Sequence, residues 1–125
     1  VLDPRAADPD AGADAVDLVV DRLDRDLGAV ARVAGIQAAK RCDALIPLCH
    51  TLPLDSVDID FSRSAPGRLR CMVTVRTTAR TGVEMEALVG TSTALLTVWD
   101  MVKGIDSDLA VDDVRLLEKS KELIP

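Results

Sequence analysis

Two alternating segments joined by a turn constrain the fold most. In "SVDIDFS" (56–62) every second residue is apolar, and "RLRCMVTVRT" (68–77) repeats this period after the connecting sequence "RSAPG". A period of two is typical of a strand with one buried and one solvated face, and Pro-Gly favours a turn. The sequence therefore predicts a β-hairpin over residues 56–78, with aspartates on the outer face of one strand facing arginines on the other.

Helical periodicity appears before the hairpin. Apolar residues recur at helical spacing over residues 13–23, and again in "LGAVARVAGIQAAKR" (27–41). Spacings of three and four residues place side chains on one face of a helix. The predicted shared face of the second segment consists of Val30, Val33, Ala34 and Ala38.

A longer helical segment follows the hairpin. "TGVEMEALVGTSTALLTVWDMVKG" (81–104) predicts a helix of about six turns. Thr81 and Glu84 match a capping box, and Gly104 is expected to end the helix. The small residues at 90–94 should allow close approach of another helix or a sheet.

The last patterned segment, "LAVDDVRLLEKS" (109–120), is predicted to be a strand. Helix, hairpin, helix and strand in this order favour an α+β fold, with helices packed on one face of an antiparallel sheet. Residues 1–12 are rich in Asp, Pro, Ala and Gly and are expected to form a flexible acidic arm. We expect residues 13–125 to form a single domain.

The net charge of −6 is concentrated near the start of the chain. Residues 1–26 hold eight Asp and three Arg, so the remaining body is nearly neutral and does not exclude an anionic substrate. A dense basic stripe is missing, which argues against nucleic acid as a partner. Apolar runs are too short for a membrane helix, and three irregularly spaced cysteines suit a reducing compartment. We therefore expect a cytoplasmic protein.

The only histidine, His50, follows Cys49 in a segment bounded by Pro47 and Pro53. An imidazole on a stiff loop is well suited to carry protons near neutral pH, although a plain surface histidine would have the same sequence. A zinc site is an alternative interpretation, but the C-x-x-C spacing typical of such sites is missing. Its ligands would be Cys42, Cys49, His50 and Cys71.

Three further charged groups allow both a structural and a functional interpretation. Glu84 and Glu86 open the long helix, where carboxylates suit the helix dipole. Asp100 and Lys103 are three residues apart, which indicates either a surface ion pair or a proton shuttle beside a phosphate-binding cation. The lysines of "LLEKSKE" (116–122) are either solvated or contact phosphate.

Five motifs occur together in one order: "ARVAGIQAAKR", "LIPLCH", "TGVEMEAL", "WDMVK" and "VRLLEKS". In this order they resemble the molybdenum cofactor biosynthesis protein C family, the cyclic pyranopterin monophosphate synthases, over about residues 28–120. The resemblance implies a ferredoxin-like α+β fold and a hexamer built from three dimers, with the pocket at a subunit interface. It also implies a lyase that converts a cyclised dihydroguanosine triphosphate into cyclic pyranopterin monophosphate and releases pyrophosphate.

Matched residue by residue, the resemblance assigns substrate-binding and catalytic roles to residues of these motifs. It implies neither a cofactor nor a metal ligand. The implied substrate-binding residues are Leu48, Cys49, His50, Glu84, Met85 and Glu86. The implied catalytic residues are His50, Asp100, Lys103 and Lys119. His50 would then meet Asp100 and Lys103 across subunits.

The chain differs from the family at one position of the catalytic set, and also in the opening strand and in the tail after "KS". The family carries a lysine ahead of the helix of residues 27–41, where this sequence has Asp24, with Arg25 next to it as a substitute cation. An alternative reading is therefore a catalytically impaired paralogue that acts as a binding or assembly subunit.

Overall fold

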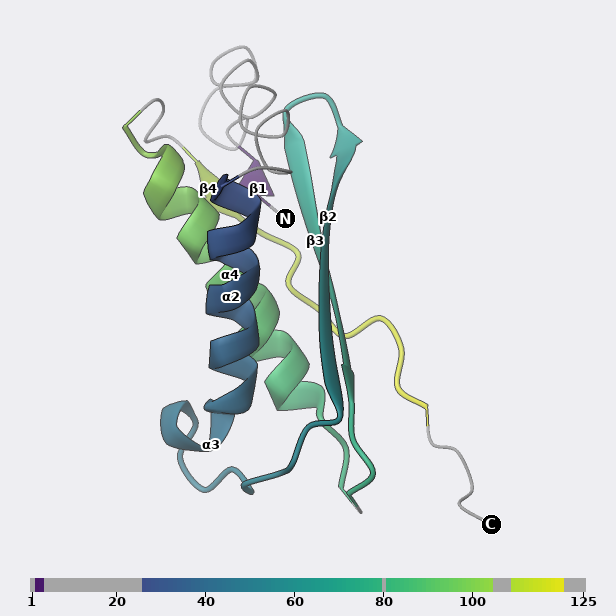
Figure 1. Cartoon of the computed structure of the whole chain (residues 1–125). Coiled ribbons are helices and arrows are strands. Elements are labelled where there is room, and N and C mark those ends of the chain that lie inside the picture. The colour runs from purple at the N-terminus through teal and green to yellow at the C-terminus, as the bar shows by residue number, and fades with distance from the viewer. Residues whose placement is uncertain (1, 4–25, 80, 105–108, 121–125) are drawn as a thin grey trace.

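The computed structural model describes residues 2–3, 26–79, 81–104 and 109–120 (Figure 1). Its elements are β1 (Leu2–Asp3), α2 (Asp26–Lys40), α3 (Cys42–Leu45), β2 (Ser56–Ala65), β3 (Arg68–Arg76), α4 (Glu84–Val102) and β4 (Ala110–Val111). The helix predicted over residues 13–23 and the substitute cation Arg25 lie outside the described residues.

The strands form one antiparallel sheet in the order β2-β3-β1-β4. Leu2 of β1 pairs with Leu69 of β3 on one side and with Val111 of β4 on the other. Residues 2 and 3, which we had assigned to the flexible arm, are therefore a strand inside the sheet. Two residues carry no readable period, so only pairing with neighbours defines this strand.

The predicted hairpin is confirmed. Val57 pairs with Val75, and Pro66 with Gly67 makes the turn, where Gly67 has a φ of 75°. A positive φ at this place is natural for glycine, since it has no Cβ. The expected charge pairing occurs between Asp58 and Arg76, whose side chains lie 3.0 Å apart on the exposed face.

Helices α2 and α4 pack together against one face of the hairpin, which confirms the predicted α+β class (Figure 1). Apart from the short α3, the described elements follow the β-α-β-β-α-β order of ferredoxin-like folds. The helices approach closely where Gly35 faces Gly90: a Cβ on Gly35 would lie 2.9 Å from the Gly90 carbonyl oxygen. The predicted close approach at the small residues of α4 is thus confirmed.

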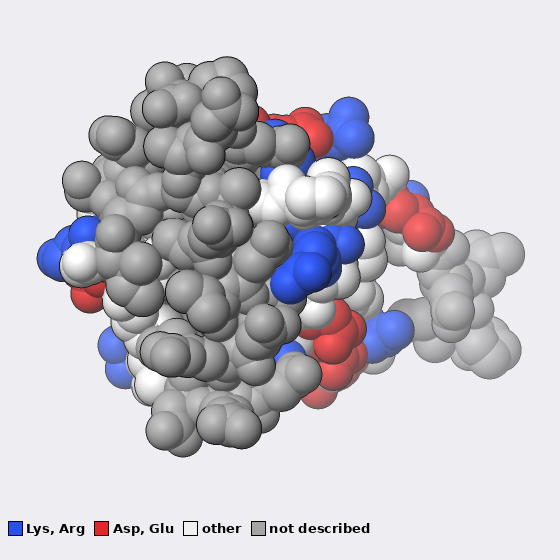
Figure 2. All heavy atoms as spheres, turned by 90° about the horizontal axis from the view of Figure 1, so that it is seen from above, with Lys and Arg blue, Asp and Glu red and all other residues white. Residues whose placement is uncertain are grey.

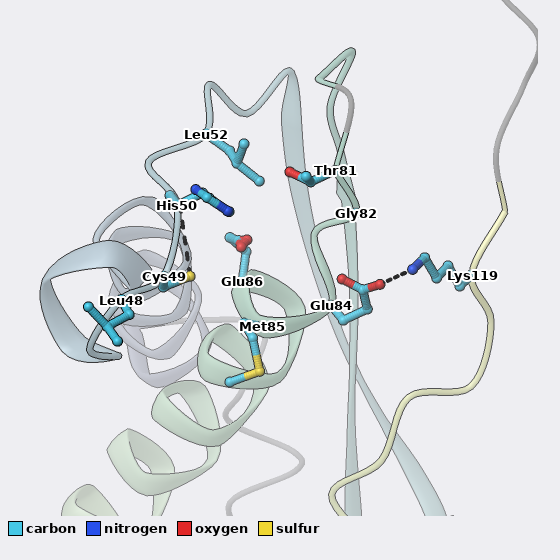
Figure 3. Close-up of a pocket in the computed structure, with 10 residues that line it drawn as sticks. All are labelled: Leu48, Cys49, His50, Leu52, Thr81, Gly82, Glu84, Met85, Glu86 and Lys119. Carbon is cyan, nitrogen blue, oxygen red and sulfur yellow. Dashed lines mark hydrogen bonds and ion pairs between the residues drawn. The ribbon is translucent and has the colours of Figure 1, made fainter.

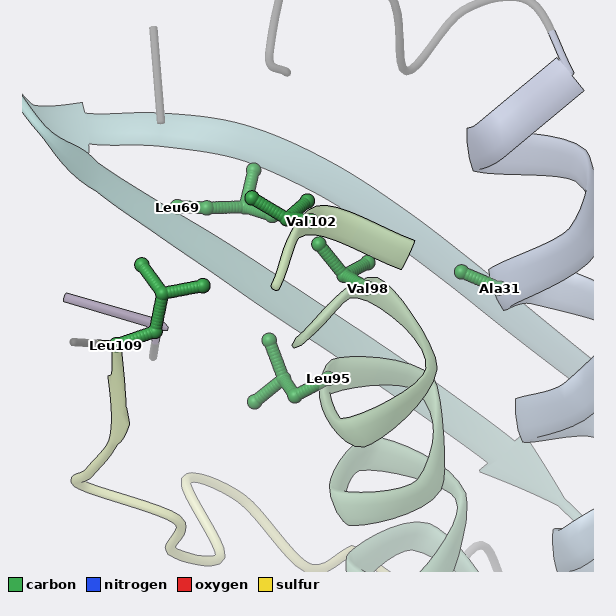
Figure 4. Close-up of a cluster of buried hydrophobic side chains, with 6 residues drawn as sticks. All are labelled: Ala31, Leu69, Leu95, Val98, Val102 and Leu109. Carbon is green, nitrogen blue, oxygen red and sulfur yellow. The ribbon is translucent and has the colours of Figure 1, made fainter. Parts of the chain in front are cut away.

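A cluster of buried apolar side chains joins α4 to the sheet (Figure 4). The cluster comprises Ala31, Leu69, Leu95, Val98, Val102 and Leu109. The face predicted for α2 is partly wrong, because Val30 and Val33 are each 52% exposed, while Ala31 and Ala38 are buried. The tight helix crossing leaves room only for small side chains, so the two valines point away from it.

Two details at the ends of elements also differ from prediction. Val83, not Thr81, occupies the N-cap of α4, and no side chain of the described residues caps this end. Of the strand predicted over residues 109–120, only Ala110–Val111 is a strand. Its partner β1 has just two described residues, and Asp113 adopts a φ of 51°, which interrupts the extended backbone.

One side chain of α2, Arg32, reaches the edge strand β2. The Arg32 guanidinium donates a hydrogen bond from Nε to the Ile59 carbonyl at 3.2 Å and lies 5.5 Å from the centre of the Phe61 ring. This contact satisfies an edge carbonyl that would otherwise be open to another strand. Figure 2 shows basic and acidic side chains interspersed on the described part of the end face. None of the described helices is long and apolar enough to cross a bilayer.

Candidate functional site

A hollow of about 470 Å³ opens where the loop after α3, the segment before α4 and the extended C-terminal segment meet (Figure 3). Its walls come from parts of the chain far apart in sequence. The lining residues are Leu48, Cys49, His50, Leu52, Thr81, Gly82, Glu84, Met85, Glu86 and Lys119.

The loop begins with a tight turn that presents two of these residues. The Cys49 amide donates to the Ile46 carbonyl at 3.2 Å, Pro47 holds the second position, and Leu48 the third with a φ of 63°. This is the geometry of a type II turn, in which glycine is the usual third residue. A fully exposed leucine in a left-handed conformation is strained, and such strain is concentrated at functional sites.

Two side-chain hydrogen bonds tie the rest of the loop to its surroundings. The Thr51 hydroxyl donates to the Asp43 carboxylate at 2.7 Å, which links the loop to α3. The Thr77 hydroxyl donates to the Pro53 carbonyl at 2.6 Å, which links it to the end of β3. His50, between these anchors, is exposed to the hollow on a backbone held at both ends.

Glu86 is the buried acid of the site. It lies in the first turn of α4 and is only 4% exposed, and its Oε2 atom has no hydrogen-bond partner among the described residues. Burial raises the pKa of this carboxyl, and the negative charge of Glu84 raises it further. A carboxyl of this kind can release and take up a proton closer to neutral pH than an ordinary glutamate can.

Two thiols lie beside this carboxyl. The sulfur atoms of Cys42 and Cys49 are 3.8 Å apart, and with a carboxylate oxygen of Glu86 they form a group whose ligand atoms all lie within 4.8 Å of one another. Burial raises the pKa of the Cys42 thiol to about 12, and its hydrogen bond with Cys49 adds to the rise. Cys71, the remaining cysteine of the zinc alternative, packs instead against the core cluster.

Lys119 reaches the hollow from the irregular C-terminal segment. Its ammonium forms an ion pair with the Glu84 carboxylate, and both side chains are partly exposed (Figure 3). The pair holds Lys119 near the start of α4, although residues 112–120 do not form a strand. It also brings a cation next to the Glu84 carboxylate, in the hollow that Glu86 also lines.

Asp100 and Lys103 lie elsewhere. Lys103 Nζ is 2.7 Å from Asp100 Oδ1, and the two side chains are 55% and 70% exposed, respectively. Asp100 lies fourteen residues after Glu86 on α4, a distance of about 21 Å at 1.5 Å per residue. Within the described part of one chain, this pair therefore does not join the hollow.

Sequence reasoning missed several residues of the site. Leu52 lies two residues after the motif "LIPLCH", and Thr81 and Gly82 open the motif "TGVEMEAL", but none of the three was predicted to line the site. Cys42 was considered only as a zinc ligand together with Cys71. Its proximity to Glu86 depends on which residues of α2 and α4 face each other, and the small residues at 90–94 do not specify this.

Comparisons with known proteins agree with the motif pattern. The model of the MoaC family matches residues 17–122. A cyclic pyranopterin monophosphate synthase of Rhodopirellula baltica is 50% identical over 105 residues, covering 76% of this chain and 60% of that protein. One of Novosphingobium aromaticivorans is 53% identical over 89 residues, covering 71% of this chain and 56% of that protein.

A third relative is the cyclic pyranopterin monophosphate synthase 2 of Mycobacterium bovis. It is 54% identical over 96 residues, covering 75% of this chain and 56% of that protein. The chain thus spans between 56% and 60% of the length of these curated relatives. Because the family model matches most of its length, the chain belongs to the MoaC family.

Proposed function

We propose that this chain, assembled with further copies of itself, is a cyclic pyranopterin monophosphate synthase of molybdenum cofactor biosynthesis. It converts the cyclised dihydroguanosine triphosphate into cyclic pyranopterin monophosphate and releases pyrophosphate. One observation carries the proposal: the motifs "LIPLCH" and "TGVEMEAL", more than thirty residues apart, line one hollow together with Lys119. Family membership and the names of the relatives support it.

The size and walls of the hollow suit a nucleotide-derived substrate. Its volume of about 470 Å³ lies within the roughly 300–1,000 Å³ usual for small-molecule sites. Met85, Leu52 and Leu48 offer apolar surface for a fused ring system, whereas His50 and Glu86 offer groups that exchange protons. Opening a purine ring and closing a pterin ring requires several such transfers.

The phosphates need more positive charge than the described residues of one hollow supply. Lys119 lies there, but Glu84 shares its charge, and Glu86 adds a second carboxyl. We infer that Asp100 and Lys103 of another copy complete the site. Lys103 would hold phosphate and stabilise the charge that develops as the cyclic phosphodiester forms, while Asp100 moves a proton.

A homo-oligomer, which we propose to be a hexamer built as a trimer of dimers, would also cover exposed apolar side chains. Large apolar residues exposed in the isolated chain favour such an interface. They include Val30, Val33, Leu45, Leu48, Leu96 and Leu117. We further propose a cytoplasmic location, since all three cysteines are free thiols, the state that a reducing compartment maintains.

Single-turnover kinetics with the cyclised triphosphate test the proposal. The wild-type chain should release pyrophosphate, and Asp100→Asn should abolish release while the oligomer size by gel filtration and substrate binding stay unchanged. Asn has the shape of Asp but cannot take up the proton. A wild-type chain that binds the substrate without releasing pyrophosphate would instead establish the catalytically impaired paralogue. An undiminished rate in Asp100→Asn would refute the role of that residue.

A further inference from the structure

The sulfur and oxygen atoms beside the hollow have the spacing of a metal site. Two thiolates at about 2.3 Å from a tetrahedral zinc ion lie about 3.8 Å apart, and the Cys42 and Cys49 sulfurs are 3.8 Å apart. A disulfide would require about 2.05 Å. A carboxylate oxygen of Glu86 lies within 4.8 Å of both sulfurs, and a tetrahedral ion would draw it to about 3.6 Å from each.

Glu86 supplies an independent sign of a missing partner. Its side chain is only 4% exposed, and its Oε2 atom has no hydrogen-bond partner among the described residues. Buried polar atoms are nearly always bonded, and a buried carboxylate is stabilised by an opposite charge or by a metal ion. A cation held between this carboxylate and the two sulfurs would supply the missing partner.

We propose that Cys42, Cys49 and Glu86 form a binding site for a divalent ion of the zinc class. Two thiolates and one carboxylate suit zinc far better than magnesium or calcium, which prefer oxygen ligands alone. The proposal goes beyond the synthase reaction proposed above; with an ion bound, Glu86 would be a ligand and His50 would be left to exchange protons. It replaces the zinc set considered from the sequence, in which Cys71 and not Glu86 was a ligand.

The three ligands differ in how firmly they are held. Cys42 is buried at the start of α3, and Glu86 is buried in the first turn of α4. Cys49 is on the loop of residues 46–55 and can move the short distance that closes the coordination. Cys49 and Glu86 both line the hollow, so the fourth position of the ion faces the hollow (Figure 3).

An open fourth position is characteristic of zinc ions that bind a water or a substrate atom, in contrast to closed structural sites. His50 follows Cys49 and lines the same hollow, so its imidazole is a described group that could fill this position instead. The His50→Ala variant decides whether the fourth ligand is the imidazole or a water or substrate atom. Zinc binding should weaken in this variant only if the imidazole is a ligand.

Cobalt substitution tests the site without any substrate. The full chain, stripped of metal with a chelator and kept reduced with a phosphine, is titrated with Co²⁺ and then with Zn²⁺. We expect a thiolate-to-cobalt charge-transfer band that saturates at one ion per chain and disappears when one equivalent of Zn²⁺ is added. Circular dichroism of each variant verifies that the fold is retained.

Single substitutions distinguish the residues that bind the ion from those that do not. Cys49→Ser, on the loop, should remove most of the band and weaken zinc binding by more than the roughly 10–100-fold typical of outer-shell changes. Glu86→Gln should keep the band but weaken zinc binding. The matched control Cys71→Ala should behave like the wild type. No band in the wild type, or a band unchanged in both Cys49→Ser and Glu86→Gln, would overturn the proposal, whatever the outcome of the pyrophosphate assay.

Discussion

The crossing of α2 and α4 positions the candidate site, so replacing Gly35 by alanine is a direct test of the fold around it. A Cβ at this position would lie 2.5 Å from Ile59 Cδ1, 2.9 Å from the Gly90 carbonyl oxygen and 3.1 Å from Ala94 Cβ. The first neighbour is the end of a buried side chain, but the second belongs to the backbone of α4. The helix would therefore have to move away as a body.

The expected loss of stability follows from two opposing effects. Overpacking a core costs about 1–3 kcal/mol, and the upper end applies here because a backbone atom must yield. Alanine is more favourable than glycine in a helix by about 1 kcal/mol. The net expectation is that Gly35→Ala lowers the free energy of unfolding by about 2 kcal/mol, which corresponds to a Tm about 8 °C lower.

Urea unfolding followed by the fluorescence of the single tryptophan, Trp99, measures this change. All samples must have the same protein concentration, because association contributes to apparent stability. Gly104→Ala is the matched control: a Cβ there meets no atom within 4 Å, and the change should stay below about 0.5 kcal/mol. If Gly35→Ala were as stable as the wild type, the close crossing would be refuted.

Three further predictions concern the core, the hollow and the thiols. Trp99→Phe removes the hydrogen bond that Nε1 donates to the Leu109 carbonyl at 3.0 Å. In thermal melts, it should lower the free energy of unfolding by about 1–2 kcal/mol, and an unchanged Tm would contradict this. Lys119→Met should raise KM for the triphosphate about tenfold or more. The free energy of unfolding should change little, because the ion pair with Glu84 is partly exposed. An unchanged KM would show that the lysine does not belong to the substrate site. Cys49 should be alkylated first, as peptide mass spectrometry would show, because burial raises the pKa of each of the other two thiols to about 12. At pH 8 only about one in ten thousand molecules has either of those two thiols ionised, and this fraction rises tenfold per pH unit. Modification of Cys42 or Cys71 before Cys49 would contradict the burial of these two thiols.

Elements with a strong local pattern were predictable from the sequence. The hairpin carries a period of two on both strands and a Pro-Gly turn, and α4 carries a long apolar period with small residues in its middle. These patterns depend on neighbours in sequence, so they persist in the fold. The strand predicted over residues 109–120 was wrong beyond Val111: a strand needs a partner along its length, and in the described part of the chain β1 pairs with only two of these residues.

The outward position of Val30 and Val33 could not be predicted from α2 alone. Either face of that helix is apolar enough to be buried, and the narrow distance to α4 at Gly90 selects the face with the small residues. The same crossing brings Cys42 close to Glu86, so the group formed by Cys42, Cys49 and Glu86 could not be predicted from the sequence either. By contrast, the motif residues that line the hollow were recognised through their order along the chain.

The proposed function requires a site shared between copies, in which His50 from one chain acts with Asp100 from another. Subunit complementation tests this directly. His50→Ala and Asp100→Asn, each inactive alone, are co-expressed so that mixed oligomers form at random. A shared site predicts recovery of about one quarter of wild-type pyrophosphate release, because about a quarter of the sites combine both intact residues. Recovery indistinguishable from that of the separate variants, in oligomers proven to be mixed, would contradict a shared site.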